Sequence, residues 1–278
     1  MRPRDWLALM TELKGTISFG PNFAFAYTAR RVRDADLEGL DLSSWRVAGC
    51  GAEPIQRGTL EAFSARFASV GFDGRAFTPC YGLAEFTLAA SFSPLGRGLK
   101  IDRIDAEVLA ETGVAKVSAG EEGLELVSCG VIVPGHSLEV VDDLGCLRPE
   151  RHVGQIRIQG PSMSAGYDGQ VASSAFRDGW LYTGDQGYVA EGELYVCGRT
   201  RDIIKSRGRT YFPQDLEWAA GRVDGIRPGN VAAFGVTSEG TEKVVLAAEH
   251  RDDVPASVSL RTQVARQVAD SVGVMIDE

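Results

Sequence analysis

The sequence predicts a mixed α/β protein with a β-rich middle part, and three patterns indicate this class. In residues 1–99, short apolar runs alternate with amphipathic segments. In residues 100–199, the segments are short and alternate apolar with polar residues, separated by turn residues. In residues 200–278, strand and helix patterns are mixed. We therefore expect an α/β subdomain, a β-rich subdomain and an α+β lobe, in that order.

Two features of the first part place a strand and a helix. Trp45–Gly49 predicts a strand, and Leu60, Phe63 and Phe67 fall on one face of the helix that follows it. Glycine-rich segments stand where strands end and helices begin, at Gly20-Pro21 and at Gly51-Ala52-Glu53-Pro54. Ligands of open α/β sheets lie beyond such strand ends, so we expect one edge of a binding site there. A short helix is also expected over Phe86–Ala90.

The middle and last parts contain clear strand patterns. Period-two segments predict strands at Leu138–Val141, Gln155–Ile158 and Gly192–Val196, which would form a small barrel or a curled sheet. The polar stretch Lys100–Glu122 has no pattern, and we expect it to be a flexible insertion. In the last part we expect a basic hairpin, a helix from about Gln214, strands near Asn230–Val236 and Lys243–Glu249, and a helix with Leu260, Val264, Val268 and Val272 on one face.

Composition excludes several classes of function. The chain has 278 residues with a net charge of -9, which argues against a broad nucleic-acid-binding surface. Its five cysteines are dispersed and it has only three histidines, so we expect free thiols and no zinc site. Neither an apolar run of about 18 residues nor a signal peptide is evident, so we expect no membrane span and a cytoplasmic location.

The segment Trp180–Glu217 contains the most informative chemistry of the chain. Asp185 belongs to a Thr-Gly-Asp turn, Arg199 follows a glycine 14 residues later, and a basic hairpin comes next. One carboxylate accepts two hydrogen bonds at once, which suits the two hydroxyls of a ribose. The segment therefore predicts a nucleotide site. An Asp-capped turn with a surface ion pair is the structural alternative.

These residues resemble the C-terminal part of the adenylate-forming enzymes, which include acyl-CoA synthetases, adenylation domains and luciferases. Within that superfamily the chain is most similar to the fatty acyl-AMP ligases, through Ser128-Cys129-Gly130, Pro21-Asn22-Phe23-Ala24-Phe25 and the phrase Arg207-Gly208-Arg209 followed by Tyr211–Glu217. The resemblance extends from about Pro3 to about Glu249 and implies the adenylate-forming fold, in part: the α/β subdomain, the β-barrel-like subdomain and an incomplete α+β C-terminal lobe. In fatty acyl-AMP ligases a family-specific insertion lies near residues 100–122.

The resemblance also implies roles for individual residues. Tyr81 would stack on adenine, with Gly82 beside it and Gly51 and Ala52 against the opposite face of the ring; Asp185 and Arg199 would bind the ribose. Glu85 would act in catalysis and hold Mg²⁺, a hard cation that prefers oxygen ligands. A buried core tyrosine and a glutamate at a helix N-terminus are the structural alternatives for Tyr81 and Glu85.

Further roles concern the hinge and the acyl substrate. Arg201 would be the hinge about which the small lobe rotates. Lys205 would face the site in one pose and act in catalysis, or else remain a solvated surface lysine. Asn22 and Phe23 would line the acyl pocket, although aromatic residues at that spacing also build the core face of a helix. His136 and His152 have no recognisable nucleophile partner and receive no catalytic role.

The implied reaction is attack of a fatty acid carboxylate on the α-phosphate of ATP, followed by transfer of the acyl group to an acyl carrier protein or, alternatively, to coenzyme A. Two family elements are not found in the chain: the phosphate-binding loop rich in Ser, Thr and Gly, and the late catalytic lysine. We therefore expect a fragment that is inactive alone, or else a non-catalytic nucleotide-binding or interaction module. We also expect an exposed sheet edge or apolar face that favours homodimers.

Overall fold

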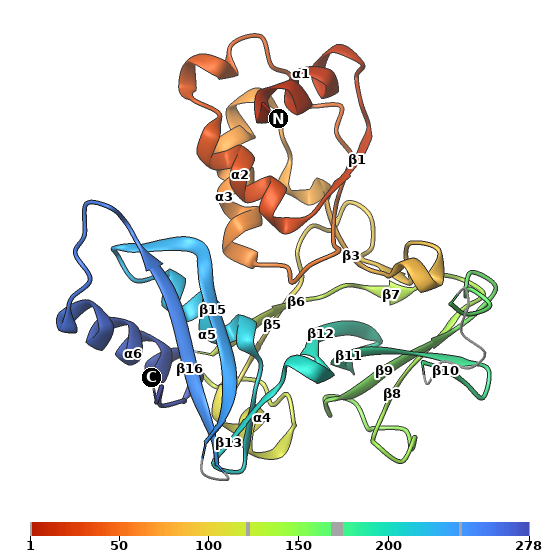
Figure 1. The fold of residues 1–278 in the computed structure, drawn as a ribbon. Coiled ribbons are helices and arrows are strands. Elements are labelled where there is room, and N and C mark those ends of the chain that lie inside the picture. The colour runs from red at the N-terminus through yellow and green to blue at the C-terminus, as the bar shows by residue number, and fades with distance from the viewer. Residues whose placement is uncertain (1, 121–122, 168–174, 239–240, 278) are drawn as a thin grey trace.

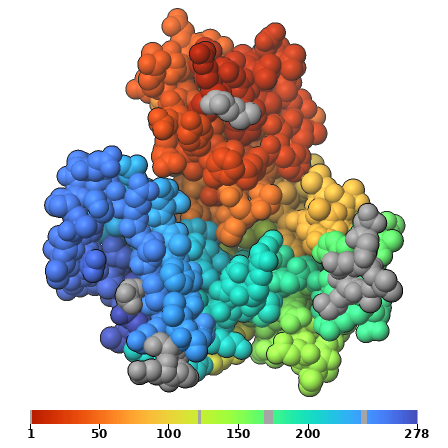
Figure 2. Space-filling model, in the orientation of Figure 1, coloured from red at the N-terminus to blue at the C-terminus, as the bar shows by residue number. Residues whose placement is uncertain are grey.

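The computed structural model describes residues 2–120, 123–167, 175–238 and 241–277. Figure 1 shows three bodies: helices α1 to α3 with their sheet at the top, an antiparallel sheet at the lower right, and a lobe containing α5, α6, β15 and β16 at the lower left. The same arrangement is visible in the space-filling view of Figure 2. The predicted mixed α/β class is confirmed. The exact boundaries at residues 99 and 199 stay predictions.

The first body is a partly parallel sheet with helices against it. Its strands have the order β1-β2-β3-β4-β7, in which β1, β2 and β3 are parallel and β4 and β7 antiparallel. Its elements are α1 Pro3–Glu12, β1 Ile17–Gly20, α2 Asn22–Arg31, β2 Val47–Cys50, α3 Arg57–Phe67, β3 Phe77–Tyr81, β4 Ser91–Phe92 and β7 Val131–Ile132. Because parallel strands end at the same edge, β1, β2 and β3 all deliver their C-terminal residues to one side of this body.

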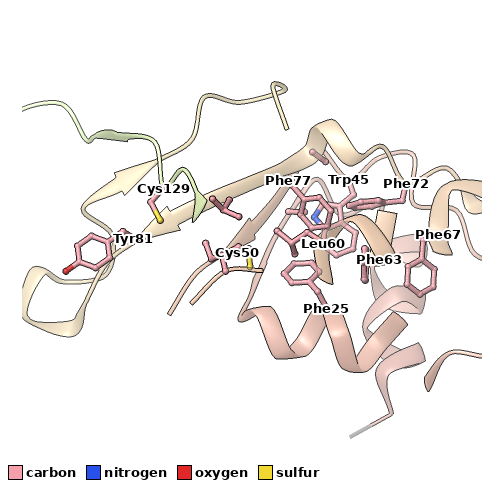
Figure 3. Close-up of a cluster of buried hydrophobic side chains, with 14 of the residues drawn as sticks. Phe25, Trp45, Cys50, Leu60, Phe63, Phe67, Phe72, Phe77, Tyr81 and Cys129 are labelled. Atoms are coloured by element: carbon pink, nitrogen blue, oxygen red, sulfur yellow. The ribbon is translucent and has the colours of Figure 1, made fainter. Parts of the chain in front are cut away.

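An aromatic core holds the first body together. Leu60, Phe63 and Phe67 have no exposed surface, so the predicted apolar face of α3 is confirmed. The Phe63 ring meets the Phe25 ring of α2 edge to face, with centroids 5.1 Å apart, and Figure 3 shows Trp45 within the same cluster. Burial of each large apolar side chain contributes roughly 1.5–3 kcal/mol. This core fixes α2 and α3 on the sheet, close to the ends of its strands.

The β-rich part is built around the long strand β11. Strand β11 (Trp180–Ala190) pairs with β9 (Gly154–Gln159) along one side and with β10 (Phe176–Arg177) and β12 (Glu193–Arg199) along the other. Strand β8 (Ser137–Val141) completes the sheet beyond β9. Of the two forms expected, a small barrel or a curled sheet, the pairings in the described part of the chain give an open five-stranded antiparallel sheet.

The expectation of a flexible stretch over Lys100–Glu122 was wrong for residues 101–112, and the expectation that the stretch is an insertion stays a prediction. Strand β5 (Ile101–Ile104) and helix α4 (Ala106–Thr112) lie within it, and β5 pairs with β6 (Leu124–Val127). The capping residues explain the helix: the Asp105 carboxylate accepts the backbone N–H groups of Glu107 and Val108, at 3.0 and 3.1 Å. Gly113, with φ 69°, ends it. Residues 121–122 lie outside the described part.

The predicted C-terminal elements are confirmed. The hairpin β13 (Ile204–Ser206) and β14 (Arg209–Tyr211) precedes α5 (Pro213–Gly221), and β15 (Ile226–Ser238) pairs with β16 (Thr241–His250). Helix α6 (Val258–Val272) buries its four-residue stripe of Leu260, Val264, Val268 and Val272. Helix α4 packs on this lobe, because Ala110 belongs to the lobe's apolar core and Glu111 pairs with Arg209 of β14.

The segment after Tyr81 differs from its predicted helix. A single 3-10 turn covers Ala84–Phe86, and Thr87 then adopts φ 66°, which stops the helix. All five cysteines are free, as expected; Cys50, Cys129 and Cys197 are buried and Cys146 is exposed. None of the helices in the described residues is long and apolar enough to cross a membrane.

One face of the first body is apolar and open. Strand β1 lies at the edge of the sheet, and its alternate residues Ile17 and Phe19 are 59% and 52% exposed. Leu13, just before the strand, is 72% exposed. Parallel sheets are normally covered on both faces, and an unpaired edge strand invites association. An exposed edge and an apolar face were both expected, and both are present; dimerisation over them stays a prediction.

We expect the purified chain to self-associate through this face. Ile17→Lys places a charge on the exposed face and should shift the molecule toward monomer, whereas Leu144→Lys, at a site 89% exposed outside the first body, should not. Sedimentation velocity over a range of concentrations measures the change. A wild-type chain that is monomeric at all concentrations would contradict the prediction.

Candidate functional site

The pair Asp185 and Arg199 is brought together by a tight hairpin. Strands β11 and β12 are joined by Glu191 and Gly192, which have φ values of 52° and 73°. Two positive φ values are required by the type I′ turn that matches the twist of a hairpin. In the resulting register Asp185 lies opposite Arg199, and the guanidinium Nε is 3.4 Å from the carboxylate Oδ1. The 14-residue spacing in the sequence is therefore the length of one hairpin.

The Thr-Gly-Asp segment lies inside β11 as a local irregularity, where the sequence predicted a turn. The pairing of β11 with β9 shifts between Tyr182 and Gln186, and Gly184 adopts φ 78°. The Thr183 hydroxyl donates to the Ile156 carbonyl at 3.0 Å and accepts the Asp185 N–H at 3.1 Å. A β-bulge redirects a side chain away from the ladder. This one fixes the Asp185 backbone beside the end of β3.

Tyr81 ends strand β3 and contacts Asp185 directly. Its hydroxyl donates to the Asp185 Oδ2 at 2.6 Å, and Figure 3 shows its ring at the end of the sheet, apart from the aromatic cluster. Burial raises the pKa of Asp185, and the hydrogen bond from Tyr81 and the charge of Arg199 oppose that rise. Burial also raises the pKa of the Tyr81 hydroxyl. Tyr81 is therefore a neutral donor that holds the carboxylate in place.

Two glycines are required where backbone segments approach each other. A Cβ at Gly82 would overlap the carbonyl oxygen of Leu88, and one at Gly51 would lie 2.8 Å from both the carbonyl oxygen and the sulfur of Cys80. Only glycine permits such approaches. The loop at Gly51 therefore lies in close contact with Cys80 near the end of β3, and Gly82 allows the chain to fold back after Tyr81.

These residues surround a single cavity of about 150 Å³. Five of the six residues predicted to contact a nucleotide line it: Ala52, Tyr81, Gly82, Asp185 and Arg199. Gly51, the sixth, immediately precedes Ala52. The lining also includes apolar side chains such as Ile55 and Val196. Apolar walls with a few convergent polar groups are typical of small-molecule sites.

The C-terminal lobe contributes a wall that the sequence did not predict. Gln214 and Trp218 of α5 line the cavity, and a Cβ at Gly198 would lie 2.9 Å from the Gln214 side chain. The four-residue separation of Gln214 and Trp218 places both on one face of a helix. That spacing was available in the sequence, but only the packing of α5 against β12 shows that this face meets the site.

Glu85 lies at a second cavity of about 370 Å³, together with Arg177, Thr183 and Gly184. The Tyr167 hydroxyl donates to its carboxylate at 2.6 Å. Among the described residues, groups of three or more histidine, cysteine or acidic side chains that could hold a metal are absent. A single carboxylate nonetheless fits Mg²⁺, because this ion usually takes one or two carboxylates together with substrate phosphates and water.

Besides Gly51, four predicted residues lie outside both cavities. Asn22 is buried and its side chain contacts backbone, while Phe23 is 63% exposed. Arg201 lies in the 3-10 turn Thr200–Asp202, between β12 and the C-terminal hairpin. The exposed Lys205 follows it, and its backbone N–H donates to Glu242 at 2.9 Å. The acyl, hinge and catalytic roles of these residues stay predictions.

Asp215, in the first turn of α5, is a buried carboxylate that sequence reasoning did not single out. Its Oδ1 has no hydrogen-bond partner among the described residues. Burial, with a smaller contribution from the Glu217 carboxylate, raises the pKa of Asp215 to about 8. Its proton is therefore retained at neutral pH, since an unpaired buried charge is costly.

Comparison with known proteins defines the class of this site. The family described as AMP-binding enzyme matches residues 1–168. The chain therefore belongs to the AMP-binding enzymes, and its adenylate-forming fold is shared with their solved structures.

Particular relatives narrow the similarity to fatty acyl ligases. A candidate acyl-CoA synthetase of Caulobacter vibrioides is 40% identical over 98% of this chain and 49% of its own. The medium-chain fatty acid–[acyl-carrier-protein] ligase JamA of Moorena producens is 34% identical over 90% of this chain and 45% of its own. One of the solved fatty acyl-adenylate ligases of E. coli and L. pneumophila has a TM-score of 0.89 and 40% identity, over 99% of this chain and 50% of its own. The chain thus spans about half the length of these relatives.

Asp215 generates a prediction about stability and pH. In the unfolded chain this carboxyl group ionises near its ordinary pKa of about 4, whereas the folded chain retains the proton up to a pH of about 8. Stability should therefore fall as the pH rises through this window, by up to about 1.4 kcal/mol per pH unit, and level off above it. Asp215→Asn should remove this decline and raise the urea midpoint at pH 8.

The matched control is Asp252→Asn, at a side chain 93% exposed. Urea unfolding at pH 5, 6, 7 and 8 measures all three proteins. An identical pH slope in wild type and Asp215→Asn would contradict the assignment of a buried, protonated carboxyl group.

Proposed function

We propose that this chain supplies the adenosine-binding half of a ligase that activates a fatty acid with ATP to an acyl-adenylate. The observation that carries the proposal is the convergence of Ala52, Tyr81, Gly82, Asp185 and Arg199 on one cavity. These residues come from three separate stretches of sequence and were each expected to contact a nucleotide. The similarity to a fatty acyl-adenylate ligase supports the acid substrate and the adenylate product.

Each residue has a chemical task in this proposal. The Tyr81 ring and the loop around Ala52 offer flat and small surfaces on which a purine stacks. The Asp185 carboxylate, oriented by Tyr81 and Arg199, accepts the ribose hydroxyls, and a charged acceptor makes such bonds stronger than neutral ones. The nucleoside would thereby be fixed so that its α-phosphate meets the acid in a defined geometry, and positioning of this kind accounts for much of catalysis.

Magnesium and the acyl acceptor extend the proposal. Glu85 would hold Mg²⁺ at the second cavity, where the ion would neutralise phosphate charge. We propose an acyl carrier protein as the acceptor of the acyl group, because JamA is an acyl-carrier-protein ligase. Coenzyme A is the alternative acceptor, because the Caulobacter relative is described as an acyl-CoA synthetase. The rotation of the C-terminal lobe about Arg201 would alternate the two half-reactions.

Binding of AMP tests the nucleotide site. Wild type should bind AMP in isothermal titration calorimetry, and Asp185→Asn should weaken binding by roughly 10-fold to 100-fold, because hydrogen bonds to a charged acceptor are lost. Wild type should lose a similar factor for 2′,3′-dideoxy-AMP, and the variant should not distinguish the two ligands. Asp252→Asn should bind as wild type does. Equal affinity of Asp185→Asn and wild type for AMP would exclude the proposed ribose contact.

Catalytic competence is a separate test. With a fatty acid and Mg²⁺, the isolated chain should show no exchange of pyrophosphate into ATP above background. The phosphate-binding loop and the late catalytic lysine are not found in its sequence, and loss of one such electrostatic partner typically lowers the rate by about 10² to 10³. A full-length fatty acyl-adenylate ligase assayed in parallel is the control. Exchange at a rate near that of the full-length enzyme would show that this chain is competent alone.

A further inference from the structure

The loop formed by residues 51–56 is a wall of the cavity and contains a residue in an unfavourable backbone conformation. Ala52, Glu53, Pro54 and Ile55 all line the cavity. Ala52 adopts φ 66°, in the left-handed region that a residue with a Cβ rarely enters. Such a conformation costs on the order of 1 kcal/mol and persists where the surroundings hold it. The surroundings that hold Ala52 are therefore part of the site.

The first restraint comes from Glu53 and reaches the start of α2. Its carboxylate Oε1 accepts the backbone N–H of Phe23, in the first turn of the helix. Helix α2 has Pro21 at its N-cap, with no capping side chain and no acidic residue in its first turn. Glu53 supplies both missing elements from outside the helix: an acceptor for a free N–H group and a negative charge at the positive end of the dipole.

The second restraint runs in the opposite direction. The Asn22 amide oxygen accepts the backbone N–H of Gln56 at 3.0 Å, and the Asn22 side chain is buried. Gln56 is the N-cap residue of α3, so this bond ties the end of the loop to the beginning of α2. The loop and α2 are thus joined by two reciprocal side-chain to backbone hydrogen bonds, one on each side of Pro54.

The body beneath this pair of bonds is closely packed. Helices α2 and α3 share the aromatic core, with the Phe25 and Phe63 ring centroids 5.1 Å apart. At the other end of the loop, Gly51 leaves no space for a side chain against Cys80. The loop is therefore fixed at its start by β3 and at its end by α2, and Ala52 lies between the two attachments.

We infer that Asn22 and Glu53 are positioning residues of the nucleotide cavity, which together hold Ala52 in its left-handed conformation against the bound purine. The inference rests on the proposed function for the identity of the ligand. It assigns Asn22 a task different from the acyl-pocket role expected from the resemblance, since its amide oxygen is already bound to Gln56. It also gives the Glu53 carboxylate a use that requires no contact with a metal or a phosphate.

The experiment measures AMP affinity of the full chain by calorimetry. Glu53→Ala should weaken AMP binding about tenfold, the equivalent of one hydrogen bond to a charged group, whereas Glu53→Gln keeps an acceptor oxygen and should stay within about threefold of wild type. Asn22→Ala should weaken binding and Asn22→Asp, which also keeps an acceptor oxygen, should do so less. The control is Glu61→Ala, a carboxylate 54% exposed on α3 that pairs with Arg57.

A second variant separates positioning from general loss of structure. Glycine adopts positive φ without strain, so adding Ala52→Gly to Glu53→Ala should restore part of the AMP affinity that Glu53→Ala loses. If Glu53→Ala instead weakens binding by unfolding the chain, adding Ala52→Gly should restore none of it. AMP affinity of Glu53→Ala equal to that of wild type would overturn the inference. So would an equal effect of Glu53→Ala with Ala or Gly at position 52.

Failure of the proposed function can be distinguished from failure of this inference. If wild type itself binds no AMP, the nucleotide assignment fails. Amide hydrogen exchange then tests, without any ligand, whether Glu53 restrains the loop through its hydrogen bond to Phe23. The Phe23 amide should exchange faster in Glu53→Ala than in wild type and Glu61→Ala. Equal protection of that amide in all three proteins would overturn the inference independently of any ligand.

Discussion

The hydrogen bond from the Tyr81 hydroxyl to the Asp185 carboxylate, 2.6 Å long, connects the end of the parallel sheet to the antiparallel sheet. This contact is one polar link between the two sheets at the cavity, and it gives the Asp185 carboxylate a neutral donor. Arg199 completes the arrangement from the neighbouring strand. Because both carboxylate oxygens have partners, a ligand hydroxyl that approaches Asp185 meets an acceptor whose orientation is already fixed, which reduces the entropy lost on binding.

The C-terminal lobe is tied to the rest of the chain through α4 and α5. Helix α4 contributes Ala110 to the apolar core of the lobe and pairs Glu111 with Arg209, while α5 places Gln214 and Trp218 on the cavity. Asp215 lies in the same first turn of α5 as a buried, protonated acid. The Glu111 and Arg209 side chains are 49% and 33% exposed, so a rotation of the lobe about Arg201, which stays a proposal, would separate a partly solvated ion pair and not a buried one.

Particular elements show how far the sequence could be interpreted. The stripe from Leu260 to Val272 predicted α6 because a four-residue repeat of valine and leucine has one physical solution, a buried helix face. Helix α4 was missed because it has only 7 residues, too few to show a helical repeat, although its Asp105 cap and Gly113 end were present in the sequence. The helix predicted over Phe86–Ala90 was wrong because Thr87 adopts a positive φ, a conformation that the residue type does not predict. In this region the chain folds back so that the Leu88 backbone lies against Gly82.

The sequence by itself determined the fold class and the strands and helices with strong periodicity, because local patterns encode local backbone geometry. It also pointed to five residues that line the cavity, through the Gly-Ala, Tyr-Gly, Thr-Gly-Asp and Gly-Arg motifs. Only the tertiary structure decided which of these motifs meet, that α5 closes one wall, and that Asn22 turns its amide toward Gln56. The physical reason is distance along the chain. Tyr81 and Asp185 are 104 residues apart, and their contact depends on how two sheets pack, which no local pattern specifies.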